Sequence, residues 1–270
     1  MTTSIDRSAA FRALHESGTF VMPNPWDAGS ARYLASLGFP ALASTSSGFA
    51  WTQGHADGRS TLEETIAHLE ALVAAVELPI NADFENGFAD QPEDVAVNVR
   101  RAAATGVAGL SIEDSTKDGA EPLYAFELAV ERVRAAREAL DGIGSGVVLT
   151  GRSEGFIAGR PDLDETVRRL VAYAEAGADC LYAPGISTRE QISTIVQAVA
   201  PKPVNVLIWG GFLPLDELRE LGVRRLSTGG GLAANAWNGA MLAASGLASG
   251  SFDGLKGAAK SADIVAAFGR

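Results

Sequence analysis

The sequence Ala104-Thr105-Gly106-Val107 recurs in similar form as Glu175-Ala176-Gly177-Ala178 and Glu220-Leu221-Gly222-Val223. Each stretch follows a segment with helical periodicity and leads into a short apolar segment typical of a strand. The glycine can take the left-handed conformation that ends a helix, and the apolar residue after it then begins a strand. The recurrence predicts repeated helix–strand units with parallel strands.

Eight short segments are typical of buried strands, and they are residues 20–22, 41–45, 80–84, 109–113, 147–152, 180–183, 204–207 and 225–228. The longer segments 62–76 and 92–105 have helical periodicity, with Ser60, Thr61 and Asp90 as candidate N-caps. An open doubly wound sheet is the competing architecture. Eight successive units without a long interruption favour closure into an α/β fold of the (β/α)8 TIM barrel type.

The length and composition fit one domain of this kind. The chain has 270 residues, of which 47% are hydrophobic, and this is enough apolar material to fill one barrel. We therefore predict a single domain over residues 1–270 that includes the C-terminal helices, with the Ala/Gly/Ser-rich segment 243–257 as a loop between them.

The charge of the chain restricts its partners. There are 33 acidic and 22 basic residues, and the formal net charge is -11. This field repels nucleic acids and anionic membranes, so we expect neither as a partner and expect a small molecule instead. An anionic substrate then needs a metal ion or a well-placed arginine to hold it.

The cysteine content and the lengths of the apolar segments indicate the cellular compartment. Cys180 is the only cysteine, so no disulfide can form within the chain, and its apolar surroundings predict a buried core thiol. The first eight residues lack an apolar core of a signal peptide, and no stretch is long and apolar enough to span a membrane. We expect a cytoplasmic protein.

Carboxylates follow two neighbouring predicted strands at the mouth of the barrel. Asp83 and Glu85 close the third strand two residues apart, and Glu113 and Asp114 close the fourth. Oxygen ligands without nearby histidine or cysteine suit Mg²⁺, or Mn²⁺, better than zinc. Some of these acids could instead cap helices or pair with arginines, and for Asp114 the structural role is as plausible as the functional one.

Other candidate residues lie at the ends of further strands. Arg152 ends the fifth strand, where its guanidinium could hold a carboxylate or phosphoryl group or balance the acids. Ser44-Thr45-Ser46-Ser47-Gly48 and Ser227-Thr228-Gly229-Gly230-Gly231 could receive an anion or be plain turns. Trp26 and Asp27 could line the mouth or cap a helix.

These motifs together resemble the isocitrate lyase/phosphoenolpyruvate mutase superfamily. The similarity runs in order through most of the barrel, over Asn24-Pro25-Trp26-Asp27, the Ser-Gly loop, Asp57-Gly58, Asp83-Phe84-Glu85-Asn86-Gly87, Ile112-Glu113-Asp114, Arg152-Ser153-Glu154-Gly155-Phe156-Ile157-Ala158-Gly159, Tyr173-Ala174-Glu175-Ala176-Gly177-Ala178-Asp179 and Pro203-Val204-Asn205-Val206. No single motif is decisive, but the ordered set is specific.

The resemblance implies a role for each matching residue. Asp83 would ligate Mg²⁺ directly, while Asp57, Glu85 and Glu113 would hold its water shell. The substrate would contact Trp26, Ser46, Ser47, Gly48, Arg152 and Asn205, with catalytic roles for Arg152 and Glu113. Superfamily members pass through an enolate of a 2-oxo acid, and they commonly form oligomers in which neighbours exchange C-terminal helices, so we expect a homodimer or homotetramer.

Departures from the superfamily's patterns leave the reaction open. The isocitrate and methylisocitrate lyases carry a cysteine loop after the fourth strand, whereas residues 115–122 here contain no cysteine, and the asparagine loop of the phosphomutases is also missing. We expect a Mg²⁺-dependent lyase that cleaves a C–C bond of a small 2-oxo or 2-hydroxy acid. The alternatives are P–C bond chemistry of the phosphomutase or phosphonopyruvate hydrolase type, and a non-catalytic metabolite-binding barrel. The composition of residues 115–123 further predicts a mobile lid over the site.

Overall fold

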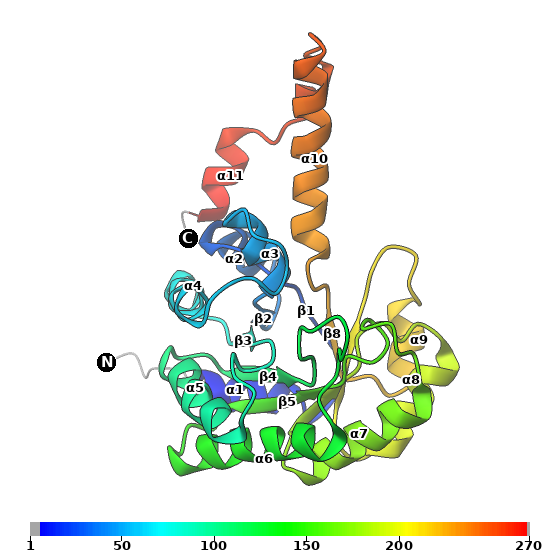
Figure 1. The fold of residues 1–270 in the computed structure, drawn as a ribbon. Coiled ribbons are helices and arrows are strands. Elements are labelled where there is room, and N and C mark those ends of the chain that lie inside the picture. Colours follow the sequence, from blue (N-terminus) through cyan, green and yellow to red (C-terminus); the bar gives the residue numbers. More distant parts are fainter. Residues whose placement is uncertain (1–5, 269–270) are drawn as a thin grey trace.

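The computed structural model describes residues 6–268, in which eight parallel strands form a ring surrounded by helices (Figure 1). The strands are β1 (Phe20–Met22), β2 (Leu42–Ala43), β3 (Ile80–Asp83), β4 (Gly109–Glu113), β5 (Val148–Arg152), β6 (Cys180–Tyr182), β7 (Val204–Leu207) and β8 (Arg225–Ser227). They pair in the order β1-β8-β7-β6-β5-β4-β3-β2, and Ala43 N donates a 3.1 Å hydrogen bond to Pro23 O across the remaining gap. The predicted (β/α)8 TIM barrel is confirmed, and each strand lies within the segment predicted for it.

The helices are α1 (Arg7–Leu14), α2 (Ala28–Ser36), α3 (Ser46–Thr52), α4 (Leu62–Ala75), α5 (Pro92–Ala104), α6 (Phe126–Gly142), α7 (Leu163–Glu175), α8 (Arg189–Val199), α9 (Leu215–Glu220), α10 (Gly231–Ala248) and α11 (Ser261–Phe268), with a 3₁₀ turn, η1, at Asp253–Leu255. The glycines of the three recurring stretches end α5, α7 and α9 with φ values of 89°, 104° and 84°. These left-handed conformations are the ones that the sequence pattern predicts.

Two predicted helix starts have different outcomes. Thr61 caps α4, because its hydroxyl accepts a hydrogen bond from Glu64 N while the Glu64 carboxylate accepts one from Thr61 N. Asp90 was the wrong choice of cap for α5. The residue before a proline is held in an extended conformation, so Gln91 occupies the cap position and Asp90 lies one residue too early. Asp90 instead accepts a 2.5 Å hydrogen bond from the Tyr124 hydroxyl.

The N-terminal end of the barrel is filled by apolar side chains. Phe11 of α1 is fully buried and packs with Phe20 and Met22 of β1 and with Val148 of β5. Cys180 of β6 is also fully buried, which confirms the predicted core thiol. Space for a ligand is therefore confined to the opposite end, where the strands end.

The C-terminal helices differ from the prediction. Helix α10 projects away from the barrel, and α11 returns to pack beside α2 (Figure 1). The segment 243–257 is not one loop, because its first six residues continue α10, as alanine and leucine in this segment favour helix. In residues 6–268, no helix is both long and apolar enough to cross a membrane.

Candidate active site

A cavity of about 190 Å³ lies among the C-terminal ends of the strands. Six of the residues predicted to bind the metal or the substrate line it, and they are Ser46, Ser47, Asp57, Asp83, Arg152 and Asn205. Ligands of (β/α)8 barrels bind at this end. The cavity is thus the candidate active site.

Four other candidates lie outside the walls of this cavity. Glu85 and Glu113 lie behind it, in contact with cations described below. Gly48 packs closely on Trp26, since a Cβ at Gly48 would lie 3.1 Å from Trp26 Cβ, and Gly48 N donates to Thr45 Oγ1 over 3.3 Å. The Thr45 hydroxyl therefore caps α3 by accepting from the Gly48 amide, and the substrate contacts of Gly48 and Trp26 remain predictions.

Arg152 lies at the centre of the acidic residues. Its Nη1 is 3.1 Å from Asp83 Oδ1 and 3.3 Å from Glu113 Oε2, and its Nε pairs with Glu154. The register of β4 and β5 places Glu113 directly opposite Arg152, so the sheet itself brings these two groups together. Only 14% of the Arg152 side chain is exposed, and its three carboxylate contacts fix the guanidinium plane.

The serine-rich segment after β2 is not a loop throughout, because Ser46, Ser47 and Gly48 begin α3, and it orients Asp83. Asp83 Oδ2 accepts hydrogen bonds from Ser46 N over 2.9 Å and from Ser46 Oγ over 2.7 Å, while Asp83 N donates to Ser44 Oγ over 2.8 Å. Ser47 Oγ lies 3.1 Å from Thr45 Oγ1. This segment therefore fixes the orientation of the Asp83 carboxylate through hydrogen bonds, and its role as an anion receptor remains a prediction.

Burial and like charges perturb the acids of this site. Burial raises the pKa of Asp57, Glu85 and Glu113 above their ordinary values, and the neighbouring Asp83 carboxylate raises each of them further. Burial opposes the charge on Arg152 too, but the carboxylates of Glu154, Glu113 and Asp83 outweigh it and raise the Arg152 pKa. Perturbed groups clustered at a cavity are typical of functional sites.

The acids leave more negative charge than the chain neutralises. Around the cavity, Arg152 pairs with Asp83, Glu113 and Glu154, and Lys117 pairs with Glu85, whereas Asp57 has no ion-pair partner within residues 6–268. In residues 6–268, no three acidic, histidine or cysteine side chains are close enough to form a complete ligand cage. Mg²⁺ keeps several waters and needs only one or two carboxylates, so the residues fit a hydrated Mg²⁺, and the role of Asp83 as its direct ligand remains a prediction.

The comparisons with known proteins identify the family. The family model described as phosphoenolpyruvate phosphomutase matches residues 11–248. The chain belongs to the phosphoenolpyruvate mutase/isocitrate lyase superfamily.

Three relatives show where the chain stands in this superfamily. A crystal structure of a candidate lyase/mutase from Burkholderia cenocepacia J2315 has 46% identity and a TM-score of 0.94, and the match covers 98% of this chain and 96% of that one. Oxaloacetate decarboxylase from Bradyrhizobium sp. (strain ORS 278) is 32% identical over 80% of this chain and 74% of its own. The crystal structure of 2,3-dimethylmalate lyase has a TM-score of 0.85 at 28% identity, covering 97% of this chain and 94% of the other.

The segment between β4 and α6 contains residues 115–123, for which the sequence predicts a lid. Ser115 and Leu123 pair as an antiparallel bridge, so residues 115–123 form a loop with joined ends. Lys117 at its tip pairs with Glu85, and its ammonium lies 5.1 Å from the centre of the Phe88 ring. These three residues are the non-glycine residues with positive φ in the part of the chain that the structure describes, so backbone strain is concentrated where the loop meets the site.

Asp114 has a structural role. Asp114 Oδ2 accepts hydrogen bonds from Arg169 Nη1 over 3.1 Å and from the Tyr173 hydroxyl over 2.7 Å, and Oδ1 accepts one from Glu154 N over 2.7 Å. Its side chain is 1% exposed. This carboxylate joins β4 to α7 and to the residues after β5, which is the structural alternative left open by the sequence.

Asn205 lines the cavity, but both ends of its amide have partners. Nδ2 donates to Ser227 Oγ over 2.9 Å, and Oδ1 accepts from Arg225 Nε over 2.9 Å. Arg225 also donates to Thr150 Oγ1 over 3.0 Å. Asn205 is therefore held rigidly in the floor of the cavity, and its contact with a substrate remains a prediction.

Sequence reasoning missed several residues of this superfamily site. Lys117 was placed in the lid without a partner, and Glu154, Asn24 and Tyr182 were not singled out. Glu154 follows Arg152 by two residues, and this i, i+2 spacing is a usable signal at a strand end. The contact of Lys117 with Glu85 joins loops 32 residues apart and has no local signal.

Proposed function

We propose that this enzyme is a Mg²⁺-dependent lyase that cleaves a C–C bond of a small 2-oxo or 2-hydroxy carboxylic acid and forms an enolate of a 2-oxo acid. The observation that carries the proposal is the Arg152 guanidinium, which the carboxylates of Asp83, Glu113 and Glu154 fix at the cavity. Cleavage of such a bond places negative charge on the substrate oxygen, and a fixed guanidinium stabilises that charge without reorganising.

Each group of the chain has a proposed part in this chemistry. Asp83 and the acids around it would hold Mg²⁺, which supplies Lewis-acid stabilisation of an oxyanion when bound. Arg152 binds the oxygen on which charge develops. Ser46, Ser47 and Asn205 line the cavity and would contact the substrate carboxylate, for which Ser46 and Asn205 would have to exchange their present hydrogen-bond partners.

The relatives support C–C chemistry. An oxaloacetate decarboxylase and a 2,3-dimethylmalate lyase are among the proteins to which this chain is similar. The cavity of about 190 Å³ favours a substrate as small as oxaloacetate or 2,3-dimethylmalate. The reactive cysteine of the isocitrate lyases has no counterpart, because the only cysteine is buried in β6, so we expect isocitrate and methylisocitrate to be poor substrates.

P–C bond chemistry is the second candidate. The matching family model is named for phosphoenolpyruvate phosphomutase, and the stretch from Arg152 to Gly159 resembles the phosphomutases more than the lyases. The same arginine could hold a phosphoryl group as well as an enolate oxygen. Release of phosphate from phosphonopyruvate, or its isomerisation to phosphoenolpyruvate, would distinguish this activity.

A substrate panel tests the proposal. Oxaloacetate, 2,3-dimethylmalate, methylisocitrate and phosphonopyruvate are incubated with enzyme and Mg²⁺, and pyruvate, oxalate, glyoxylate, propionate and phosphate are measured. The Asp83→Ala variant gives the background, because Mg²⁺ alone decarboxylates oxaloacetate slowly. We expect C–C cleavage of oxaloacetate or a substituted malate well above that background. Phosphate release alone would favour the second candidate, and tight 2-oxo acid binding without turnover would show a metabolite-binding barrel.

We also propose that the enzyme is a homo-oligomer. Trp237, Met241 and Leu242 of α10 and Phe252 beyond it are 47%, 62%, 65% and 73% exposed, on a helix that projects from the barrel (Figure 1). Such a run of exposed apolar side chains is typical of an interface. Light scattering should give a mass of two or four chains, and a monomer would contradict the proposal.

A further inference from the structure

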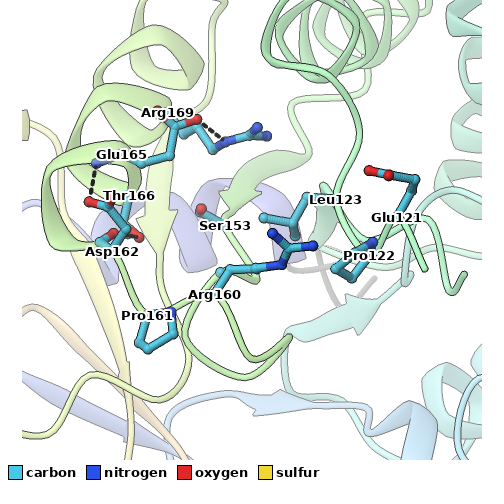
Figure 2. A pocket seen from close by; sticks show the side chains of 11 residues that line it. Glu121, Pro122, Leu123, Ser153, Arg160, Pro161, Asp162, Glu165, Thr166 and Arg169 are labelled. Atoms are coloured by element: carbon cyan, nitrogen blue, oxygen red, sulfur yellow. Dashed lines mark hydrogen bonds and ion pairs between the residues drawn. The ribbon is translucent and has the colours of Figure 1, made fainter. Parts of the chain in front are cut away.

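A second cavity, of about 480 Å³, lies outside the barrel between the 115–123 loop and α7. It shares no lining residue with the candidate active site. Glu121, Pro122 and Leu123 of the loop form one side, and Glu165, Thr166 and Arg169 of α7 form the other, with Ser153 and Arg160 between them (Figure 2).

Ser153 brings a buried hydrogen-bonding group to this cavity. The residue is 1% exposed, and its hydroxyl has no hydrogen-bond partner within residues 6–268. A buried hydroxyl without a partner costs free energy, which a bound ligand would recover. Ser153 follows Arg152 directly, and because side chains alternate along a strand end, Arg152 faces the active site while Ser153 faces the second cavity.

The charges of the cavity select the kind of ligand. Arg169 is already paired with Asp114 and Glu165, whereas the Arg160 guanidinium has no ion-pair partner among the described residues. One free positive charge therefore remains to bind a carboxylate. Glu121 and Asp162 also line the cavity and oppose any negative charge that is not placed directly against Arg160, so the cavity suits a ligand with one carboxylate.

The remaining surface is apolar. Pro122, Leu123 and Pro161 supply it, and they lie on both sides of Arg160 in the sequence and in space (Figure 2). A ligand with a short hydrocarbon body would bury this surface, while its carboxylate pairs with Arg160 and accepts a hydrogen bond from Ser153.

We propose that this cavity is a binding pocket for a small aliphatic monocarboxylate, distinct from the active site. The ligand contacts residues 121–123 of the loop and residues at the start of α7 at once. Its binding therefore holds the 115–123 loop against the barrel. The lid role of this loop rests on the proposed function, whereas the binding itself does not.

Calorimetry with 3-methylbutanoate tests the pocket. The matched neutral probe is 3-methylbutanamide, which has the same shape and no charge. We expect the carboxylate to bind at least 10-fold more tightly than the amide, and saturating oxalate with Mg²⁺ to leave its affinity unchanged. We also expect slower hydrogen exchange in residues 115–123 when 3-methylbutanoate is bound.

Variants locate the binding. Arg160→Gln should weaken 3-methylbutanoate binding at least 10-fold, and Ser153→Ala about 5-fold, whereas Arg134→Gln on the exposed face of α6 is the control and should have no effect. Arg160 is exposed, so its replacement leaves the fold intact even if the Ser153 variant is unstable. No detectable binding at 50 mM probe, equal binding by the Arg160→Gln variant, displacement by oxalate, or unchanged exchange of the loop would each overturn the proposal.

Discussion

Replacing Arg152 by lysine keeps its charge but removes its geometry. Arg152 uses Nη1 toward Asp83 and Glu113 and Nε toward Glu154, so three carboxylates depend on two separate nitrogens. The single ammonium of lysine can replace either Nη1 or Nε but not both, and it offers no planar pair of donors to a substrate oxygen. One lost charged hydrogen bond of this kind corresponds to about 1.5–3 kcal/mol. Because charge on the substrate oxygen develops in the transition state, we expect kcat to fall roughly 10²-fold, which is about 3 kcal/mol.

Steady-state kinetics on the substrate found in the panel measure this effect, with thermal unfolding as the control for folding. Arg152→Lys should lower kcat with little change in Tm. Arg152→Met should in addition destabilise the protein by about 3–5 kcal/mol, since it leaves buried carboxylates without a partner. A lysine variant with normal kcat and only a raised KM would show that Arg152 binds substrate and transition state equally, and the catalytic role would be wrong.

Three further changes test other parts of the site and fold. Lys117→Met should speed amide hydrogen exchange of residues 115–123 roughly 10-fold, because the loop loses its ion pair to the buried Glu85 carboxylate. Unchanged exchange would show that this ion pair does not hold the loop closed. Burial lowers the pKa of His68 to about 4, so the unfolded chain takes up a proton below pH 6.5 that the folded chain takes up only near pH 4. Protonation of this residue should therefore lower the free energy of unfolding by about 1.4 kcal/mol for each unit that the pH falls within that window. His68→Leu should reduce the slope of the unfolding free energy against pH, whereas His55→Leu on the surface should not. Gly48→Ala would place a Cβ 2.7 Å from Thr45 Cγ2 and should cost about 1–3 kcal/mol in urea unfolding. Gly142→Ala at the exposed end of α6, where a Cβ meets nothing within 4 Å, should cost nothing, and equal stabilities of the two variants would contradict the packing described for α3.

The barrel could be predicted because its signals are local. The glycines at 106, 177 and 222 end helices through their own backbone conformation, and each is followed by an apolar strand, so the repeat is readable without tertiary information. The boundaries of α10 could not be predicted in this way. Alanine, glycine and serine at 243–248 are compatible with both loop and helix, and the packing of η1 against α10 accompanies the helical form.

The acidic cluster was predictable in position but not in detail. Strand ends place Asp83, Glu113 and Arg152 at one mouth, as their sequence positions indicate. Which partner each group takes depends on contacts between distant loops. Lys117 reaches Glu85 only because the loop after β4 folds back over the turn after β3, and no spacing in the sequence encodes this contact.

Exchange of the methyl hydrogens of pyruvate for deuterium tests directly whether this site forms an enolate. Pyruvate is incubated with the enzyme and Mg²⁺ in D₂O, and the loss of its methyl signal is followed by proton NMR. We predict exchange well above that seen with Mg²⁺ alone, and its loss in both Asp83→Ala and Arg152→Lys. Exchange no faster than with Mg²⁺ alone, or equally fast in the two variants, would contradict enolate formation at this cavity.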